Sequence, residues 1–238
     1  MVKLGVNLDH VATIRQQRYT PYPDMLNAIK ISESSGADSI TMHLREDRRH
    51  IQLEDIKVAR KHIKTKLNLE MAPTLEMCEI ANQIKPDFVC IVPEKRQELT
   101  TEGGLDVKKN YDLLKIVIKE LEKSNALVSL FIEPDIEVID AAKELNAGAI
   151  ELHTGKYAEA DNNEKQQYIK QISNASEYAD KLSLIVNAGH GLDYTNVKEI
   201  AKINHINELN IGHSIIAESI FLGLAEAIKK IKNLIKRV

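Results

Sequence analysis

The feature that most constrains the fold is a regular alternation of short, apolar, β-rich runs with longer amphipathic stretches. Several runs are nearly continuous in apolar residues, which is typical of parallel strands covered by helices. The runs lie at residues 3–8, 39–43, 67–71, 88–92, 127–132, 149–153, 183–187 and 208–211. The amphipathic stretches lie at 24–35, 53–63, 75–84, 107–123, 136–145, 163–181, 196–203 and 215–236. We therefore expect eight strands, each followed by helical chain.

Strict alternation of strands and helices predicts a parallel sheet, and eight strands favour its closure into a barrel. The chain has 238 residues, and such barrels typically need about 250. A Gly-x-Gly-x-x-Gly motif does not follow the first run, which weakens the alternative of a dinucleotide-binding fold. No linker or low-complexity stretch divides the sequence. We predict an α/β fold, a (β/α)8 TIM barrel, as one catalytic domain over residues 1–238.

Charge and composition limit the partners. The formal net charge is only −3, so no global attraction to nucleic acid or to an anionic membrane is expected. The first run is interrupted by Asn7, Asp9 and His10, unlike a signal peptide. No apolar run approaches the roughly 20 residues that span a bilayer. Cys78 and Cys90 lie outside any metal or redox motif, as expected of reduced thiols in a cytoplasmic protein.

Ionisable side chains gather where the predicted strands end, and barrel enzymes build their active sites at the carboxyl ends of strands. The strand-end residues are Asn7, Asp9, His10, His43, Arg45, Glu70, Glu133, Glu151, His153, Asn187, His190, His213 and Ser214. A single histidine of this kind is more commonly a hydrogen-bonded core or loop residue. Five of the eight histidines at one end are hard to explain by packing. Because histidine titrates near neutral pH, we expect a site for proton transfer.

Two glutamates stand inside predicted strands. Glu70 lies in an otherwise apolar segment, where burial should raise its pKa and make it a competent general base. A barrel carboxylate paired with an arginine is the alternative for Glu70, and this alternative is stronger for Glu151.

Two loops suggest anion binding. Glycine-containing segments 187–192 and 210–215 follow the seventh and eighth runs, the usual phosphate site of this fold, and Ser214 would open the last helix. A charged segment, 45–50, follows the second run. It is either a solvated surface loop or a second anion clamp, and we favour the clamp because arginine binds phosphate bidentately. Arg15 and Arg18 could contribute.

The segment 93–105 is long for a strand-to-helix loop. It is either a lid hinged at Gly103 and Gly104 or a static surface excursion. Two separated anion sites and a lid would suit two phosphorylated substrates joined in a pocket that excludes water.

Three other functions remain open from the residues alone. A metal-dependent barrel hydrolase or aldolase would explain many histidines, although no His-x-His or His-Glu-x-x-His motif is present. Schiff-base catalysis would require a lysine at a strand end, where His, Glu and Asn stand instead. A phosphosugar-binding or scaffold barrel without catalytic activity is the third alternative.

Seven segments in family order resemble the pyridoxine 5′-phosphate synthases of de novo vitamin B6 synthesis. They are GVNLDHVAT at 5–13, HLREDRRH at 43–50, NLEM at 68–71, VPEKRQE at 92–98, TTEGGLD at 100–106, NAGHGL at 187–192 and LNIGH at 209–213. They span nearly the whole chain, and together they are highly specific.

The resemblance implies condensation of 1-deoxy-D-xylulose 5-phosphate with 3-amino-2-oxopropyl phosphate to give pyridoxine 5′-phosphate, phosphate and water, with no metal and no organic cofactor. It implies a homo-octamer built partly through helices additional to the barrel. It gives His43 and Glu70 as general bases, His190 as general acid and Glu151 as the residue that stabilises the charged transition state. Asp9, His10, Arg45, His50 and Thr100 would bind deoxyxylulose phosphate. Asn7, Arg18, Gly191, Gly212 and His213 would bind the amino ketone phosphate.

Overall fold

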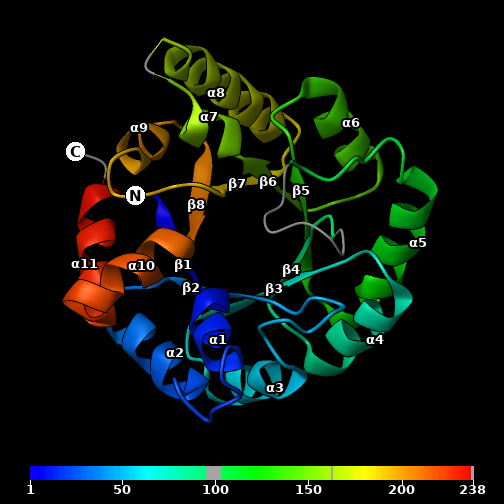
Figure 1. The fold of residues 1–238 in the computed structure, drawn as a ribbon. Helices are drawn as coiled ribbons and strands as arrows, with labels where there is room; N and C mark the ends of the chain where they lie inside the picture. The colour runs from blue at the N-terminus through cyan, green and yellow to red at the C-terminus, as the bar shows by residue number, and fades with distance from the viewer. Residues whose placement is uncertain (95–102, 162, 237–238) are drawn as a thin grey trace.

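The strands close into a parallel barrel, as predicted. The computed structural model describes residues 1–94, 103–161 and 163–236. In this part of the chain the strands are β1 (Lys3–Asn7), β2 (Ser39–His43), β3 (Lys66–Met71), β4 (Phe88–Ile91), β5 (Leu127–Ile132), β6 (Ala149–His153), β7 (Ile185–Gly189) and β8 (Ile206–Ile211). Each strand pairs with its neighbour in sequence, and β8 pairs with β1 (Figure 1).

Helices surround the barrel (Figure 1). They are α1 (Asp9–Gln16), α2 (Met25–Ser34), α3 (Leu53–His62), α4 (Leu75–Ile84), α5 (Tyr111–Leu121), the 3-10 turn η1 (Glu122–Ser124), α6 (Ile136–Glu144), α7 (Gly155–Glu159), α8 (Lys165–Lys181), α9 (Val197–Ala201), α10 (His213–Leu222) and α11 (Leu224–Leu234). The helices α1 and α7 are additional to the predicted set. Both begin within two residues of a strand end.

Several predicted bounds differ from those of the structure by a few residues, and two of the differences have a clear backbone cause. The seventh strand occupies Ile185–Gly189 rather than 183–187, because Ser183 has a φ of 59° and therefore cannot continue an extended strand. The single helix predicted over 215–236 is divided into α10 and α11 at Gly223, whose φ and ψ are 79° and 150°. This backbone conformation is accessible essentially to glycine alone.

The barrel wall is apolar on its outer face and polar on its inner face. Residues such as Leu4, Val6, Ile40 and Met42 are fully buried in the hydrophobic core. The alternate positions are polar and buried: Ser39, Thr41, Asn68, Glu151, Glu208 and Asn210. Barrels of this type usually fill the interior with Val, Ile and Leu. The polar filling here places ionisable groups inside the barrel.

Hydrogen bonds connect these interior side chains across strands. Asn68 Nδ2 donates to Thr41 Oγ1 at 3.2 Å, and Thr41 Oγ1 donates to Asn210 Oδ1 at 3.1 Å. Asn210 Nδ2 in turn donates to Glu151 Oε2 at 2.6 Å. Nearer the amino-terminal mouth, Ser39 Oγ donates to Glu208 Oε1 at 2.8 Å. Such pairing offsets the cost of burying polar groups.

In the described part of the chain, no helix combines the length and the apolar character that crossing a membrane requires.

The break at Gly223 yields a stability prediction. A Cβ at this position would meet no atom within 4 Å, so Gly223→Ala adds backbone strain without a steric clash. We expect the free energy of unfolding to fall by about 1–3 kcal/mol, the usual cost of such a conformation. Urea denaturation measures it, with the exposed Glu226→Ala in α11 as the control. An unchanged midpoint for Gly223→Ala would contradict the strain argument.

Candidate functional site

The carboxyl ends of β1, β2 and β3 bring together the first group of predicted site residues. Strand register places Glu70 directly beside His43. Asp9 lies between them and β1: its Oδ1 accepts from the His43 backbone N–H at 2.8 Å, and its Oδ2 accepts from Asn7 Nδ2 at 2.9 Å. Asn7 Nδ2 is also 3.4 Å from Glu70 Oε2. The cluster therefore combines a histidine with two carboxylates.

His43 has a partner that sequence reasoning did not identify. Its Nε2 is 2.7 Å from Glu94 Oε1, just after β4, and Glu94 Oε2 accepts from the Glu46 backbone N–H at 3.0 Å. Burial acts to raise the pKa of Glu94, but these hydrogen bonds outweigh burial and lower it. The carboxylate thus fixes the orientation of the His43 ring. The only signal in the sequence was an acidic residue directly after a strand.

Glu70 is the most perturbed carboxyl of this cluster. Burial raises its pKa well above the ordinary value, and the nearby carboxylates of Asp9 and Glu151 raise it further. Part of Glu70 remains accessible. A carboxylate in this environment takes up a proton readily once it is ionised, as a general base must.

Glu151 lies deeper in the barrel and is only 3% exposed. Burial raises its pKa to about 7, the hydrogen bond from Asn210 acts in the opposite direction, and Glu208 adds a further increase. The group that holds it is therefore an amide rather than the arginine considered from the sequence.

The ends of β6 and β7 supply a second group around His190. His190 and Gly191 both have left-handed backbones, with φ of 79° and 73°. The pKa of His190 is lowered by burial and by the neighbouring His153, while Glu159 opposes this shift. The His153 and His190 rings are 5.0 Å apart.

A third group lies where α1 and α10 begin. The rings of His10 and His213 are 4.9 Å apart, edge to face. Burial lowers the pKa of His10, with Asp9 acting in the opposite direction. Gly212 is the N-cap of α10 and lies against the Asn7 side chain, where a Cβ would be 2.9 Å from Asn7 Cβ. Ser214 does not open α10: the helix starts at His213.

The charged loop after β2 is not a freely solvated excursion. Arg45 is only 9% exposed, and its Nε donates to Asp47 Oδ1 at 3.2 Å. His50 accepts from the Ile51 backbone N–H through Nδ1 at 2.9 Å, and its ring lies 6.0 Å from that of His43. Arg45 and His50 therefore belong to the same region as His43.

The two other arginines considered as anion ligands differ in their surroundings. Arg15 makes a bidentate ion pair with Asp55, at 2.7 and 2.6 Å, which ties α1 to α3. Arg18 follows α1 and is exposed. Thr100 and most of the proposed lid lie outside the described residues.

Asp9, His43 and His50 could also meet at a metal ion. One ligand atom from each lies within 4.8 Å of the others. A carboxylate with two imidazoles suits zinc and other first-row transition metals. In the structure the Asp9 oxygens accept hydrogen bonds from His43 N–H and from Asn7 instead.

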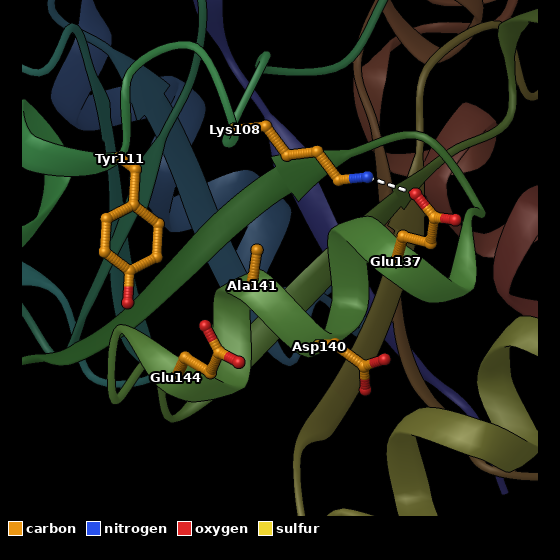
Figure 2. Close-up of a pocket in the computed structure, with 6 residues that line it drawn as sticks. All are labelled: Lys108, Tyr111, Glu137, Asp140, Ala141 and Glu144. Carbon is orange, nitrogen blue, oxygen red and sulfur yellow. Dashed lines mark hydrogen bonds and ion pairs between the residues drawn. The ribbon is translucent and has the colours of Figure 1, made fainter.

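A separate groove lies away from the barrel mouth. It has a volume of about 390 Å³ and runs between α5 and α6 on the outside of the barrel (Figure 2). Its lining residues are Lys108, Tyr111, Glu137, Asp140, Ala141 and Glu144, and Lys108 is paired with Glu137. It is shallow and holds no histidine. We place the candidate site at the barrel mouth because the acid and base groups converge there.

The raised pKa of Glu151 predicts how stability varies with pH. The unfolded chain loses this proton near the ordinary pKa of 4.5, whereas the folded protein keeps it until about pH 7, so stability falls as the pH rises between these values. At about 1.4 kcal/mol per pH unit the loss is about 3 kcal/mol. Glu151→Gln should abolish this loss, so its free energy of unfolding relative to wild type should increase between pH 4.5 and 8.

Denaturant unfolding at several pH values tests this prediction, with the exposed Glu137→Gln as control. Parallel pH profiles for Glu151→Gln and wild type would show that Glu151 is not held protonated by the fold.

Comparison with known proteins matches this chain to one family over nearly its whole length. Residues 4–237 match the family model described as pyridoxal phosphate biosynthesis protein PdxJ. The pyridoxine 5′-phosphate synthase of Prochlorococcus marinus (strain AS9601) is 53% identical over 235 residues, covering 99% of both chains. The corresponding synthase of Legionella pneumophila (strain Corby) is 51% identical over 234 residues, covering 98% of this chain and 94% of its own.

Solved structures support the fold alone. KGPDC from Streptococcus mutans superimposes with a TM-score of 0.68 at 13% identity, covering 100% of this chain and 99% of its own. Phosphoribosylanthranilate isomerase from Thermotoga maritima gives a TM-score of 0.61 at 13% identity and covers 99% of both chains. The full-length sequence matches show that the chain belongs to the pyridoxine 5′-phosphate synthase family.

Proposed function

We propose that this enzyme makes pyridoxine 5′-phosphate by condensing 1-deoxy-D-xylulose 5-phosphate with 3-amino-2-oxopropyl phosphate, releasing phosphate and water. The observation that carries the proposal is the pairing of His43 with Glu70 across β2 and β3, inside a mouth that also holds His190. Imine formation, dehydration and ring closure all require proton transfer at adjacent carbons. Several acid and base groups around one mouth support such a sequence.

Each group has a proposed role. His43 and Glu70 act as general bases, His190 acts as the general acid, and Glu151 stabilises the charged transition state. The hydrogen bond from His43 Nε2 to the Glu94 carboxylate supports the role of His43, since it fixes one ring nitrogen and leaves the other available. The raised pKa of Glu70 supports its role as a base.

The two substrates would occupy different sides of the mouth. For deoxyxylulose phosphate the proposed ligands are Asp9, His10, Arg45, His50 and Thr100. For the amino ketone phosphate they are Asn7, Arg18, Gly191, Gly212 and His213. The burial of Arg45 beside the His43 cluster supports the first set. The N-terminus of α10, whose first N–H groups lack partners within the helix, supports the second.

The proposed reaction needs no organic cofactor and no metal. The amine of the substrate itself would form the imine, so no enzyme lysine has to act as the nucleophile. The alternative is a metal-dependent hydrolase or aldolase, and the cluster of Asp9, His43 and His50 is the observation that favours it. Activity in the presence of a chelator separates the two.

Assembly and location are also proposals. We expect a homo-octamer, and the end of α10 supports self-association: Phe221 is 84% exposed and Ile220 is 71% exposed. The two buried free cysteines, Cys78 and Cys90, support a cytoplasmic location. One closed barrel carries all described site residues, which supports a single catalytic domain over 1–238.

The direct test is incubation of the metal-free protein with both phosphorylated substrates and a chelator. We expect formation of pyridoxine 5′-phosphate with release of inorganic phosphate. A folded octamer that forms neither product would refute the proposal, and activity that appears only with added metal would favour the alternative.

Removal of the proposed bases tests the site. We predict that His43→Ala and Glu70→Gln each lower kcat by about 10²–10⁴-fold, the usual contribution of one acid or base group. Steady-state kinetics measures the loss, and circular dichroism verifies the fold. Glu137→Gln is the control, since Glu137 is an exposed carboxyl on α6 outside the mouth. Near-wild-type turnover in either variant would contradict the assignment of that residue as a general base.

A further inference from the structure

His153, the last residue of β6, is a buried histidine that the proposed reaction leaves without a role. It is 6% exposed, and its Nδ1 is 2.7 Å from Glu133 Oε1, just after β5. Its Nε2 is also buried and has no hydrogen-bond partner among the described residues. A buried ring nitrogen without a partner is costly, so its retention calls for an explanation.

The His153 ring forms a triangle with two other rings. Its centroid is 5.2 Å from that of Phe131 and 5.0 Å from that of His190, and the Phe131 and His190 rings are 6.4 Å apart. Gly155 makes room for this arrangement, because a Cβ there would lie 2.5 Å from His153 Nε2 and 3.3 Å from His190 Cδ2. The unpartnered nitrogen therefore faces the space shared with His190.

Glu133 fixes the orientation of His153. The hydrogen bond from His153 lowers the pKa of Glu133 to about 2, against the effect of burial, and Lys156 and the Gly104 N–H lower it further. Glu133 is therefore ionised at neutral pH and requires a proton on His153 Nδ1. A carboxylate in this position fixes the imidazole tautomer and stabilises the imidazolium form.

Thr154 supports the backbone of His190. Its hydroxyl lies 2.7 Å from the carbonyl oxygen of Gly189 and 2.6 Å from that of His190, and its single proton can be given to either. His190 has a φ of 79°, which is uncommon for a residue other than glycine. His153, at the end of β6, thus contacts the His190 ring, and Thr154, the next residue, contacts the His190 backbone.

We propose that Glu133 and His153 form a positioning pair for His190, holding its ring in place and opposing its protonation. The proposal rests on the proposed role of His190 as general acid for its catalytic consequence, but the interaction between the two rings does not depend on that role. An imidazolium with a lower pKa gives up its proton more readily than one with a higher pKa. By opposing protonation of His190, the pair would therefore promote proton donation by its imidazolium form.

The charges around His190 determine the sign of the effect. His153 on β6 lowers the pKa of His190, in addition to the larger effect of burial, and Glu159 on α7 opposes it. Behind His153 lie Glu133 and the Lys156 ammonium, 2.8 Å from Glu133 Oε2. Replacing His153 by glutamine removes an imidazole whose cationic form would repel a proton on His190, while keeping an amide that can donate to Glu133. The pKa of His190 should then rise.

NMR titration of ¹³C-labelled histidines tests the pair, with the His190 signal assigned from His190→Gln. In His153→Gln we expect the pKa of His190 to rise by about 0.5 or more. We also expect kcat to fall about tenfold with little change in KM, because a positioning residue acts on the transition state. The alkaline limb of the kcat profile should move upward with the pKa. A role in packing alone would lower kcat without moving that limb.

Two further variants keep the test decisive. Glu133→Gln removes the carboxylate with minimal change of shape and should reduce the fraction of His153 that carries the proton on Nδ1, read from ¹⁵N shifts. Asp180→Asn is the matched control. Asp180 forms an exposed ion pair with His205, with a separation of 2.9 Å, outside the candidate site, so this variant should change neither the His190 titration nor kcat. An unshifted His190 titration in folded His153→Gln would overturn the pair. Full turnover by His190→Gln would instead overturn the proposed role of His190.

Discussion

The burial of carboxyl groups inside a polar barrel is the constraint on which the rest of the structure depends. Glu70 and Glu151 occupy interior positions of the barrel. Their carboxylates raise the pKa of nearby ionisable groups: Glu151 raises that of Glu70, and both raise that of the Cys90 thiol. An isolated carboxylate in such a place would be strongly unfavourable. The interior is therefore lined with amides and hydroxyls, such as Asn210, instead of the aliphatic side chains usual in this fold.

This polar interior explains how one barrel keeps several acid and base groups in different states. Glu70 is influenced by two other carboxylates, whereas Glu94 and Glu133 each have a histidine partner that lowers their pKa values. A glutamate can thus exchange a proton near one strand end, as Glu70 does, and remain negatively charged near another, as Glu94 and Glu133 do. Pairs of groups with opposite shifts are what acid–base catalysis at one pH requires.

Much of the fold could be predicted from the sequence because its elements obey local rules. The strands β2, β5 and β6 have the predicted bounds, since each is a buried apolar run that begins and ends at a change of composition. The break at Gly223 could not be predicted from periodicity, because the apolar spacing continues across it. The helix α1 was missed because its first residues, Asp9 and His10, are polar site residues and not a helical apolar stripe.

The candidate site was predictable only in part, for a related reason. His43, Glu70 and His190 lie at or near strand ends, and strand ends can be located in a sequence from its apolar runs. Glu94 and the pairing of Glu133 with His153 depend on which side chains meet across the mouth, and this is fixed by barrel closure. These contacts join residues on different strands, so the spacing of residues along the sequence does not predict them.

Infrared spectroscopy of the carboxyl groups in D2O, followed over a pH titration, tests most directly the claim that burial in the barrel raises the pKa of Glu70. Ordinary surface carboxyls ionise well below neutral pH, so a carbonyl band that persists above their titration comes from carboxyls of raised pKa. The account predicts a band of buried carboxylic acid in the wild-type protein that loses intensity in Glu70→Gln and keeps it in the exposed Glu137→Gln. A spectrum of Glu70→Gln identical to that of wild type would contradict it.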